Sequence, residues 1–146
     1  MALIQRHPLL TASAVIGISL VASSSLMAWD GVVEKQTFEM ENFTTQGGVT
    51  IPEVNVGWEA YGELNDARDN VILITHFFSG TSHAAGRYEE DGQPTGYWDA
   101  IIGPGKPLDT DEYYIISSDT LVNLNTNDPN VTTTGPASIN PVTGEP

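Results

Sequence analysis

The chain has no cysteine and very few basic residues. Without cysteine there is no disulfide framework, no thiol nucleophile and no thiolate metal site. Lys and Arg together number 5, against 19 Asp and Glu, so the formal net charge is −14. So few cations cannot neutralise a run of phosphates, which argues against nucleic acid and against an anionic membrane surface as partners.

Long helical patterns and internal repeats are also lacking. The 146 residues suit one domain, and 40% are hydrophobic, with 14 glycines and 9 prolines. This composition is typical of a globular chain rich in turns, and not of a disordered or coiled-coil one.

The amino terminus has the layout of a secretory signal peptide. Arg6 precedes an uncharged span, Leu9 to Ala28, that ends in the small residues S-S-S-L-M-A. We expect cleavage after Ala28, or alternatively near Ala22 to Ser25, and a periplasmic or secreted mature domain of residues 29–146. The alternative is an uncleaved anchor, because the span approaches the ~20 residues that cross a bilayer.

The next segments alternate between apolar and polar residues, as half-exposed strands do. Gln36 to Phe43 is one such strand and Val54 to Tyr61, through Val54, Val56, Trp58 and Ala60, is another. A Gly-Gly pair between them predicts an antiparallel hairpin. Further on, Trp98 to Ile102 predicts one helical turn and Tyr113 to Ser117 a short apolar strand.

The stretch Asn70 to Gly86 carries the chemistry. Val71 to Ile74 is a β-branched apolar run too short for a helix, which predicts a parallel strand buried on both faces. Polar residues crowd the end of this strand, the edge at which open α/β sheets place their ligand sites. They are His76, Ser79, Gly80, Thr81, Ser82 and His83.

The predicted sheet has about four strands and almost no helix to cover it. The apolar surfaces of Val71 to Ile74 and Tyr113 to Ile116 therefore have little to pack against. We expect an incomplete α/β sheet.

Four stretches, in order, resemble the homoserine O-acetyltransferase family, whose fold is that of the α/β-hydrolases. They are V-G-W-E-A-Y-G-E-L-N at 56–65, D-N-V-I-L-I-T-H-F-F-S-G-T-S-H-A-A-G at 69–86, Y-W-D-A-I-I-G-P-G-K-P-L-D-T-D-E-Y-Y-I-I at 97–116 and T-G-P-A-S-I-N-P-V-T-G-E-P at 134–146. The resemblance implies the N-terminal part of such a domain, with the first four strands of its sheet.

What the resemblance implies for chemistry is limited to one loop. The H-x-x-x-G turn, here His76 to Gly80, is similar to the family's oxyanion loop, and its position assigns the backbone N–H of Phe78 as an oxyanion donor. The family's catalytic serine, acid and histidine come later, so we expect no catalytic residue in this chain and no activity from it alone.

The complete protein would act on a small-molecule acyl donor and acceptor, acetyl-CoA among the donors, without a cofactor or metal, and a homodimer is compatible with it. The chain departs from the family at Ser117 to Thr133, which replaces a glycine-rich segment, and in its signal peptide. Both departures favour an exported esterase or acyltransferase over a cytosolic homoserine enzyme.

Other interpretations of the same residues carry less weight. Gly80 to Ala84 reads G-x-S-x-A, but a nucleophile elbow needs a helix directly after its serine, so we expect Ser82 to brace the loop. His76 and His83 lack a third ligand for zinc and are expected to shape the loop. Glu89 to Asp91 is expected to be a solvated turn, and Asp109 to brace the turn before the last strand.

One alternative belongs to another class of protein. A small secreted, non-catalytic binding or structural module could retain the sequence of its ancestor. It would have to fold alone with a parallel strand as an open edge, which invites aggregation.

Overall fold

The computed structural model describes residues 29–92, 94–125, 127–140 and 142–145. The expected signal peptide, residues 1–28, and its alternative as an anchor lie outside these ranges. Within the described ranges, no helix combines the length and the apolar character that crossing a bilayer requires.

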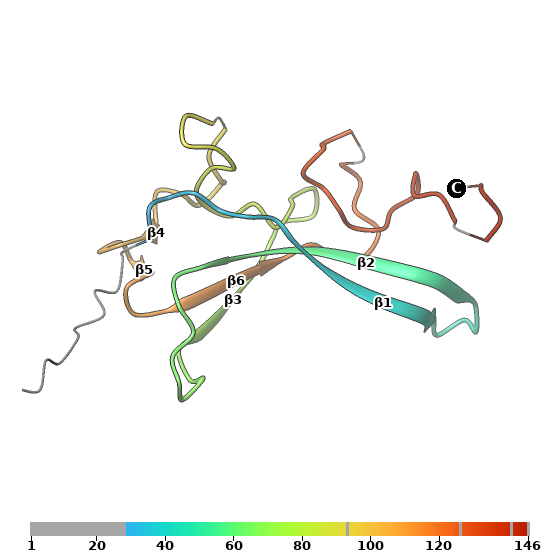
Figure 1. The fold of residues 1–146 in the computed structure, drawn as a ribbon, viewed down its shortest axis with the longest axis horizontal. Coiled ribbons are helices and arrows are strands. Elements are labelled where there is room, and N and C mark those ends of the chain that lie inside the picture. Colours follow the sequence, from blue (N-terminus) through green and yellow to red (C-terminus); the bar gives the residue numbers. More distant parts are fainter. Residues whose placement is uncertain (1–28, 93, 126, 141, 146) are drawn as a thin grey trace, which may run out of the picture.

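A four-stranded mixed sheet organises the chain, in the order β1-β2-β6-β3 (Figure 1). Antiparallel pairs join β1 to β2 and β2 to β6, whereas β3 runs parallel to β6. A separate parallel pair, β4 and β5, was not predicted, because two-residue strands carry no periodicity. The bounds are β1 Gln36–Thr44, β2 Thr50–Tyr61, β3 Val71–Thr75, β4 Ile102–Gly103, β5 Leu108–Asp109 and β6 Tyr114–Ser118.

The predicted hairpin is confirmed as β1 and β2. Its turn is closed by the Thr45 N–H, which donates to the Val49 carbonyl at 2.8 Å, and Gly48 supplies a φ of 82°. β2 begins at Thr50, earlier than the predicted start at Val54.

The prediction that β3 is buried on both faces is wrong. Ile74 is 5% exposed, but Leu73 on the opposite face is 63% exposed and Val71 46%. Among the described residues β3 pairs with β6 alone, which leaves its other edge open, and the face that carries Val71 and Leu73 is not covered either. The expectation of an incomplete sheet is therefore confirmed.

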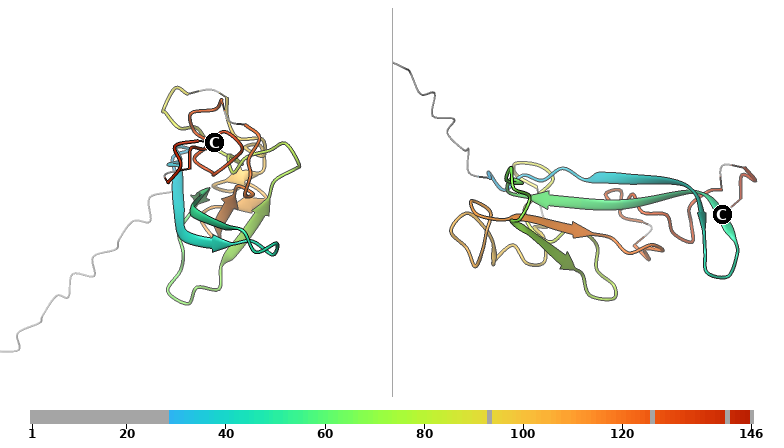
Figure 2. Two further views of the ribbon diagram at one scale, coloured as in Figure 1. Left: turned by 90° about the vertical axis from the view of Figure 1, so that its right-hand side faces the viewer. Right: turned by 90° about the horizontal axis from the view of Figure 1, so that it is seen from below.

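Loops cover only one face of the sheet. The loop that follows β3 and the coil that follows β6 lie on the same side of it, as two views at right angles show (Figure 1 and Figure 2). The predicted helical turn closes where the Trp98 carbonyl accepts from the N–H groups of Ile101 and Ile102. The core on this side contains Val33, Tyr61, Ile74, Ala84, Ala85, Ile102 and Ile115.

Candidate active-site loop

The candidate site is the loop from His76 to Gly86. β3 and β6 are parallel and end at Thr75 and Ser118, so the segments that follow them start at the same edge of the sheet. This is the edge at which the sequence predicts a ligand site.

His76 links these two segments. Its Nε2 accepts a hydrogen bond from the Thr120 N–H at 3.1 Å, and its Nδ1 lies 2.7 Å from the Phe77 carbonyl oxygen. Because a carbonyl can only accept, the ring proton is on Nδ1. The expected loop-shaping role of His76 thus has a geometric basis.

Gly80 closes the turn that follows. Its N–H donates to the Phe77 carbonyl at 2.8 Å. A Cβ at this position would lie 3.1 Å from both the His76 Cβ and the Phe77 oxygen, which is a tight contact. Glycine at the end of the H-x-x-x-G motif therefore avoids a tight contact within this turn.

Phe78 stands at the tip of the loop. Its side chain is 93% exposed. Among the described residues its N–H has no hydrogen-bond acceptor. A backbone donor that is free and held in a tight turn is what stabilisation of an oxyanion requires.

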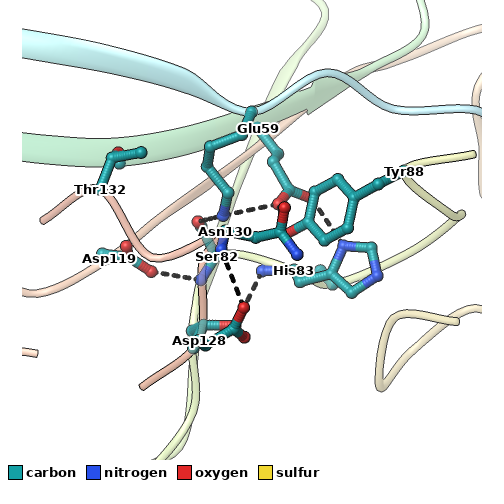
Figure 3. Close-up of polar contacts among 12 residues, drawn as sticks. Glu59, Ser82, His83, Tyr88, Asp119, Asp128, Asn130 and Thr132 are labelled. Atoms are coloured by element: carbon teal, nitrogen blue, oxygen red, sulfur yellow. Dashed lines mark hydrogen bonds and ion pairs between the residues drawn. The ribbon is translucent and has the colours of Figure 1, made fainter. Parts of the chain in front are cut away.

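The second half of the loop is fixed by a buried carboxylate, Glu59. Strand alternation places Gly57, Glu59 and Tyr61 of β2 on the face that the loop covers. Glu59 is fully buried, and the side chains around it converge on its two oxygens (Figure 3). We call Lys35, Glu59, Tyr61, Ser82, His83 and Tyr88 the Glu59 cluster.

Four donors satisfy this carboxylate. Lys35 Nζ and the Tyr88 hydroxyl each lie 2.7 Å from Oε1. The Tyr61 hydroxyl lies 2.7 Å from Oε2, and His83 Nδ1 lies 3.1 Å from the same oxygen. Since a carboxylate only accepts, the His83 proton is on Nδ1.

The cluster shifts the pKa values of its members. Burial raises the pKa of Glu59, but the hydrogen bond from His83 and the charge of Lys35 outweigh it, so the pKa lies below the ordinary value of 4.5. Burial and the Glu59 charge raise the pKa of both Tyr61 and Tyr88 far above 10. Glu59 is thus ionised and both tyrosines are neutral donors at pH 7.

These contacts hold the loop backbone. The Tyr61 oxygen accepts from the N–H groups of Ala84 and Ala85 at 2.9 and 3.1 Å. Lys35 Nζ donates to Ser82 Oγ at 2.6 Å, and Ser82 is fully buried. A buried Ser82 with no helix after it suits the expected bracing role and leaves no room for a substrate at its hydroxyl.

Asp119, at the end of β6, anchors the same loop from the other side. Its Oδ1 accepts from the Ser82 N–H at 2.5 Å, and its Oδ2 accepts from the Thr133 hydroxyl at 2.6 Å. Thr133 in turn accepts from the Gly57 N–H at 2.7 Å. A Cβ on Gly57 would lie 2.8 Å from Asp119 Oδ2, so this approach needs glycine.

The remaining candidates lie apart from this loop. In the described part of the chain, no group of three His, Asp or Glu side chains could hold a metal ion. Glu89 to Asp91 is exposed, around a turn closed by the Gly92 N–H on the Glu89 carbonyl. Asp109 Oδ1 accepts from the N–H groups of Gly105 and Asp111 at 3.0 Å each, which agrees with a bracing role.

Sequence reasoning missed Lys35, Glu59, Tyr61, Tyr88 and Asp119. The one available signal was that Glu59 and Tyr61 share a strand face, since they are two residues apart within W-E-A-Y-G.

The sheet order and the loop after β3 define the class of fold, that of the α/β-hydrolases. Among solved structures, esterase E22 has 67% sequence identity and a TM-score of 0.74, covering 79% of this chain and 31% of its own. The homoserine O-acetyltransferase of Bacillus anthracis has 49% sequence identity and a TM-score of 0.74, and the match covers 78% of this chain and 30% of the relative. The predicted fold class is confirmed.

Curated relatives give the more specific likeness. The homoserine O-acetyltransferase of Carboxydothermus hydrogenoformans is 41% identical over 116 residues, 80% of this chain and 29% of the relative. The homoserine O-acetyltransferase of Methanococcus vannielii is 44% identical over 117 residues, which are 80% of this chain and 22% of the relative. No family model matches the chain.

The resemblance to the homoserine O-acetyltransferase family is thus confirmed over four-fifths of the chain. The chain spans less than a third of the length of these relatives.

Proposed function

We propose that this chain is part of an exported, serine-dependent esterase or acyltransferase with the α/β-hydrolase fold. The observation that carries the proposal is the N–H of Phe78, which has no acceptor among the described residues. The loop that contains it is held by hydrogen bonds that join His76 and Ser82 to the segment that follows β6. In acyl transfer, such an N–H stabilises the negative oxygen of the tetrahedral intermediate.

The names of the relatives support this reaction class. Of the relatives described above, one is an esterase and three are homoserine O-acetyltransferases, and both kinds of enzyme act by attack on an acyl carbonyl. The substrates we propose are therefore a small-molecule acyl donor and an acceptor, either water or an alcohol. The proposal assigns the nucleophilic serine, the acid and the histidine base to polypeptide outside these 146 residues.

Export is proposed from the first 28 residues, with a periplasmic or secreted product that begins at Trp29. Sequencing the amino terminus of the protein isolated from its source checks this. A product that starts at Met1 would refute cleavage.

The test of the reaction is a pair of substitutions at Phe78 in the complete product of the gene. Phe78→Pro removes the N–H, whereas Phe78→Leu keeps it, and both alter a side chain that makes little packing contact. We expect the proline variant to lose about 10²–10³-fold in kcat on p-nitrophenyl acetate, and the leucine variant to lose little.

Thermal unfolding of the two variants controls for the fold. Equal rates in both variants would refute the role of Phe78. A complete product that neither hydrolyses esters nor transfers acetyl from acetyl-CoA to homoserine would refute the enzyme and leave the non-catalytic module.

A further inference from the structure

A cavity of about 330 Å³ lies against the tip of the candidate loop. We call it the loop cleft. One wall is the turn that contains Phe78, and the other is the segment that follows β6. It is lined by His76, Phe78, Ser79, Gly80, Thr120, Leu121, Val122, Asn123, Leu124 and Asn125.

Hydrogen bonds fix the two walls to each other. The Thr120 N–H donates to His76 Nε2 at 3.1 Å, and Asn125 Nδ2 donates to the Ser79 carbonyl at 3.2 Å. The wall after β6 is itself tied down, because the Val122 N–H donates to the Thr134 carbonyl at 3.0 Å. The cleft is therefore formed before any ligand enters, which lowers the entropic cost of binding.

Large apolar side chains stand unburied around this cleft. Phe78 is 93% exposed, Leu124 60% and Val122 56%. Val122 has a φ of 68°, a conformation that a β-branched residue adopts only under strain. Strained backbone gathers at ligand-binding and active sites, and here the strained residue lines the same cleft as Phe78.

The charges around the cleft restrict the ligand further. None of its lining residues is Asp, Glu, Lys or Arg. The described basic residues are Lys35, Arg68, Arg87 and Lys106, and none of them lines the cleft. Two of them are already paired with acids, since Lys35 is buried against Glu59 and Lys106 lies 3.8 Å from Asp99. With a net charge of −14 on the chain, a donor that carries several phosphates is repelled and finds no cation in the cleft.

We infer that the loop cleft binds the acyl chain of an uncharged carboxylic ester and discriminates against acyl-CoA. This inference rests on the proposed function, because it takes the cleft as the acyl subsite beside the oxyanion donor. The apolar wall of Val122 and Leu124 selects for chain length, and the absence of cations selects for a neutral leaving group.

The experiment is a titration of the ¹⁵N-labelled complete product of the gene with methyl acetate, methyl butanoate and methyl hexanoate. We expect saturable amide shifts confined to Phe78–Gly80 and Thr120–Asn125. Affinity is expected to rise roughly fourfold per added CH₂, the fold-change that corresponds to about 0.8 kcal/mol. Hexanoyl-CoA is expected to bind no more tightly than methyl hexanoate.

Two matched variants locate the binding. Leu124→Asp places a charge in the cleft and is expected to abolish the shifts. Val49→Asp makes the same kind of change at a residue that is 65% exposed in the β1–β2 turn, away from the cleft, and is expected to bind as the parent does.

The inference is overturned if the esters cause no saturable shift, if Leu124→Asp binds like the parent, or if hexanoyl-CoA binds more tightly in a salt-dependent way. Its failure is distinguishable from that of the proposed function. If esters bind at the cleft but the complete product does not turn them over, only the proposed enzymatic function is refuted. If the complete product turns esters over but they do not bind at the cleft, only the inference about the cleft is refuted.

Discussion

Removing the Glu59 carboxylate is expected to cost a large part of the stability of the chain. Glu59→Leu puts an apolar side chain of similar size in place of the carboxylate that four donors share, and only Lys35 and Tyr61 keep a second acceptor, at Ser82. Lys35, whose side chain is 8% exposed, then keeps a buried charge with no opposite charge to balance it. Breaking a buried ion pair in this way costs about 3–5 kcal/mol, against a typical total of about 5–15 kcal/mol.

The charges of Lys35 and Glu59 are expected to be coupled in their effect on stability. Lys35→Met removes the other charge and is expected to be destabilising as well, because Glu59 remains buried and ionised. The double variant replaces the pair by apolar side chains, so its loss is expected to be smaller than the sum of the single losses by at least about 1 kcal/mol.

Urea unfolding of the 146-residue chain at pH 7, followed by tryptophan fluorescence, measures these losses. Lys106→Met is the control, since Lys106 is 36% exposed and 3.8 Å from Asp99, and its pair is expected to contribute about 0–1 kcal/mol. If Glu59→Leu costs no more than Lys106→Met, or if the two cluster substitutions are additive, the Glu59 cluster does not hold this fold together.

Three further outcomes follow from the same structure. The lowered pKa of Glu59 means that its stabilisation is present above pH 4.5 and is lost as pH falls through the pKa of the folded state. In Glu59→Gln the free energy of unfolding should therefore depend less on pH in this acid range, and an unchanged pH dependence would contradict this. The raised pKa values of Tyr61 and Tyr88 mean that stability falls above pH 10, because these two tyrosines ionise more readily in the unfolded chain. Tyr61→Phe should weaken this alkaline loss, and an equal loss in the variant and the parent would contradict the prediction. Val122→Gly relieves a φ of 68° and should raise the free energy of unfolding by about 0.5–1 kcal/mol, whereas a loss would show that the valine side chain outweighs the strain.

The strands and the position of the site could be predicted because each depends on local pattern. Alternation over Gln36 to Phe43 gave β1, and the apolar run gave β3, with polar residues at its end. The strand predicted at Tyr113 to Ser117 is β6, shifted by one residue. Such signals reside in neighbouring residues and do not depend on the rest of the fold.

The face of β2 could not be predicted in the same way. The apolar residues Val54, Val56, Trp58 and Ala60 suggest one buried face, and Val54 is indeed buried. In the rest of the strand, however, the more deeply buried face contains Gly57, Glu59 and Tyr61. An acid in a strand normally faces water. Here Lys35 and His83, both 24 residues away along the chain and on opposite sides of Glu59, supply the donors that make burial tolerable, and no local pattern reports them.

The open edge of β3 has a practical consequence for anyone who produces the chain. From Asn70 to Gly86 there is no Asp, Glu, Lys or Arg, so no fixed charge guards this edge. Leu73 is 63% exposed beside it, next to unpaired backbone groups of the strand. Self-association should therefore grow with concentration, and sedimentation at two concentrations, with Leu73→Lys for comparison, will show whether dilute handling or a single surface lysine keeps the preparation monomeric.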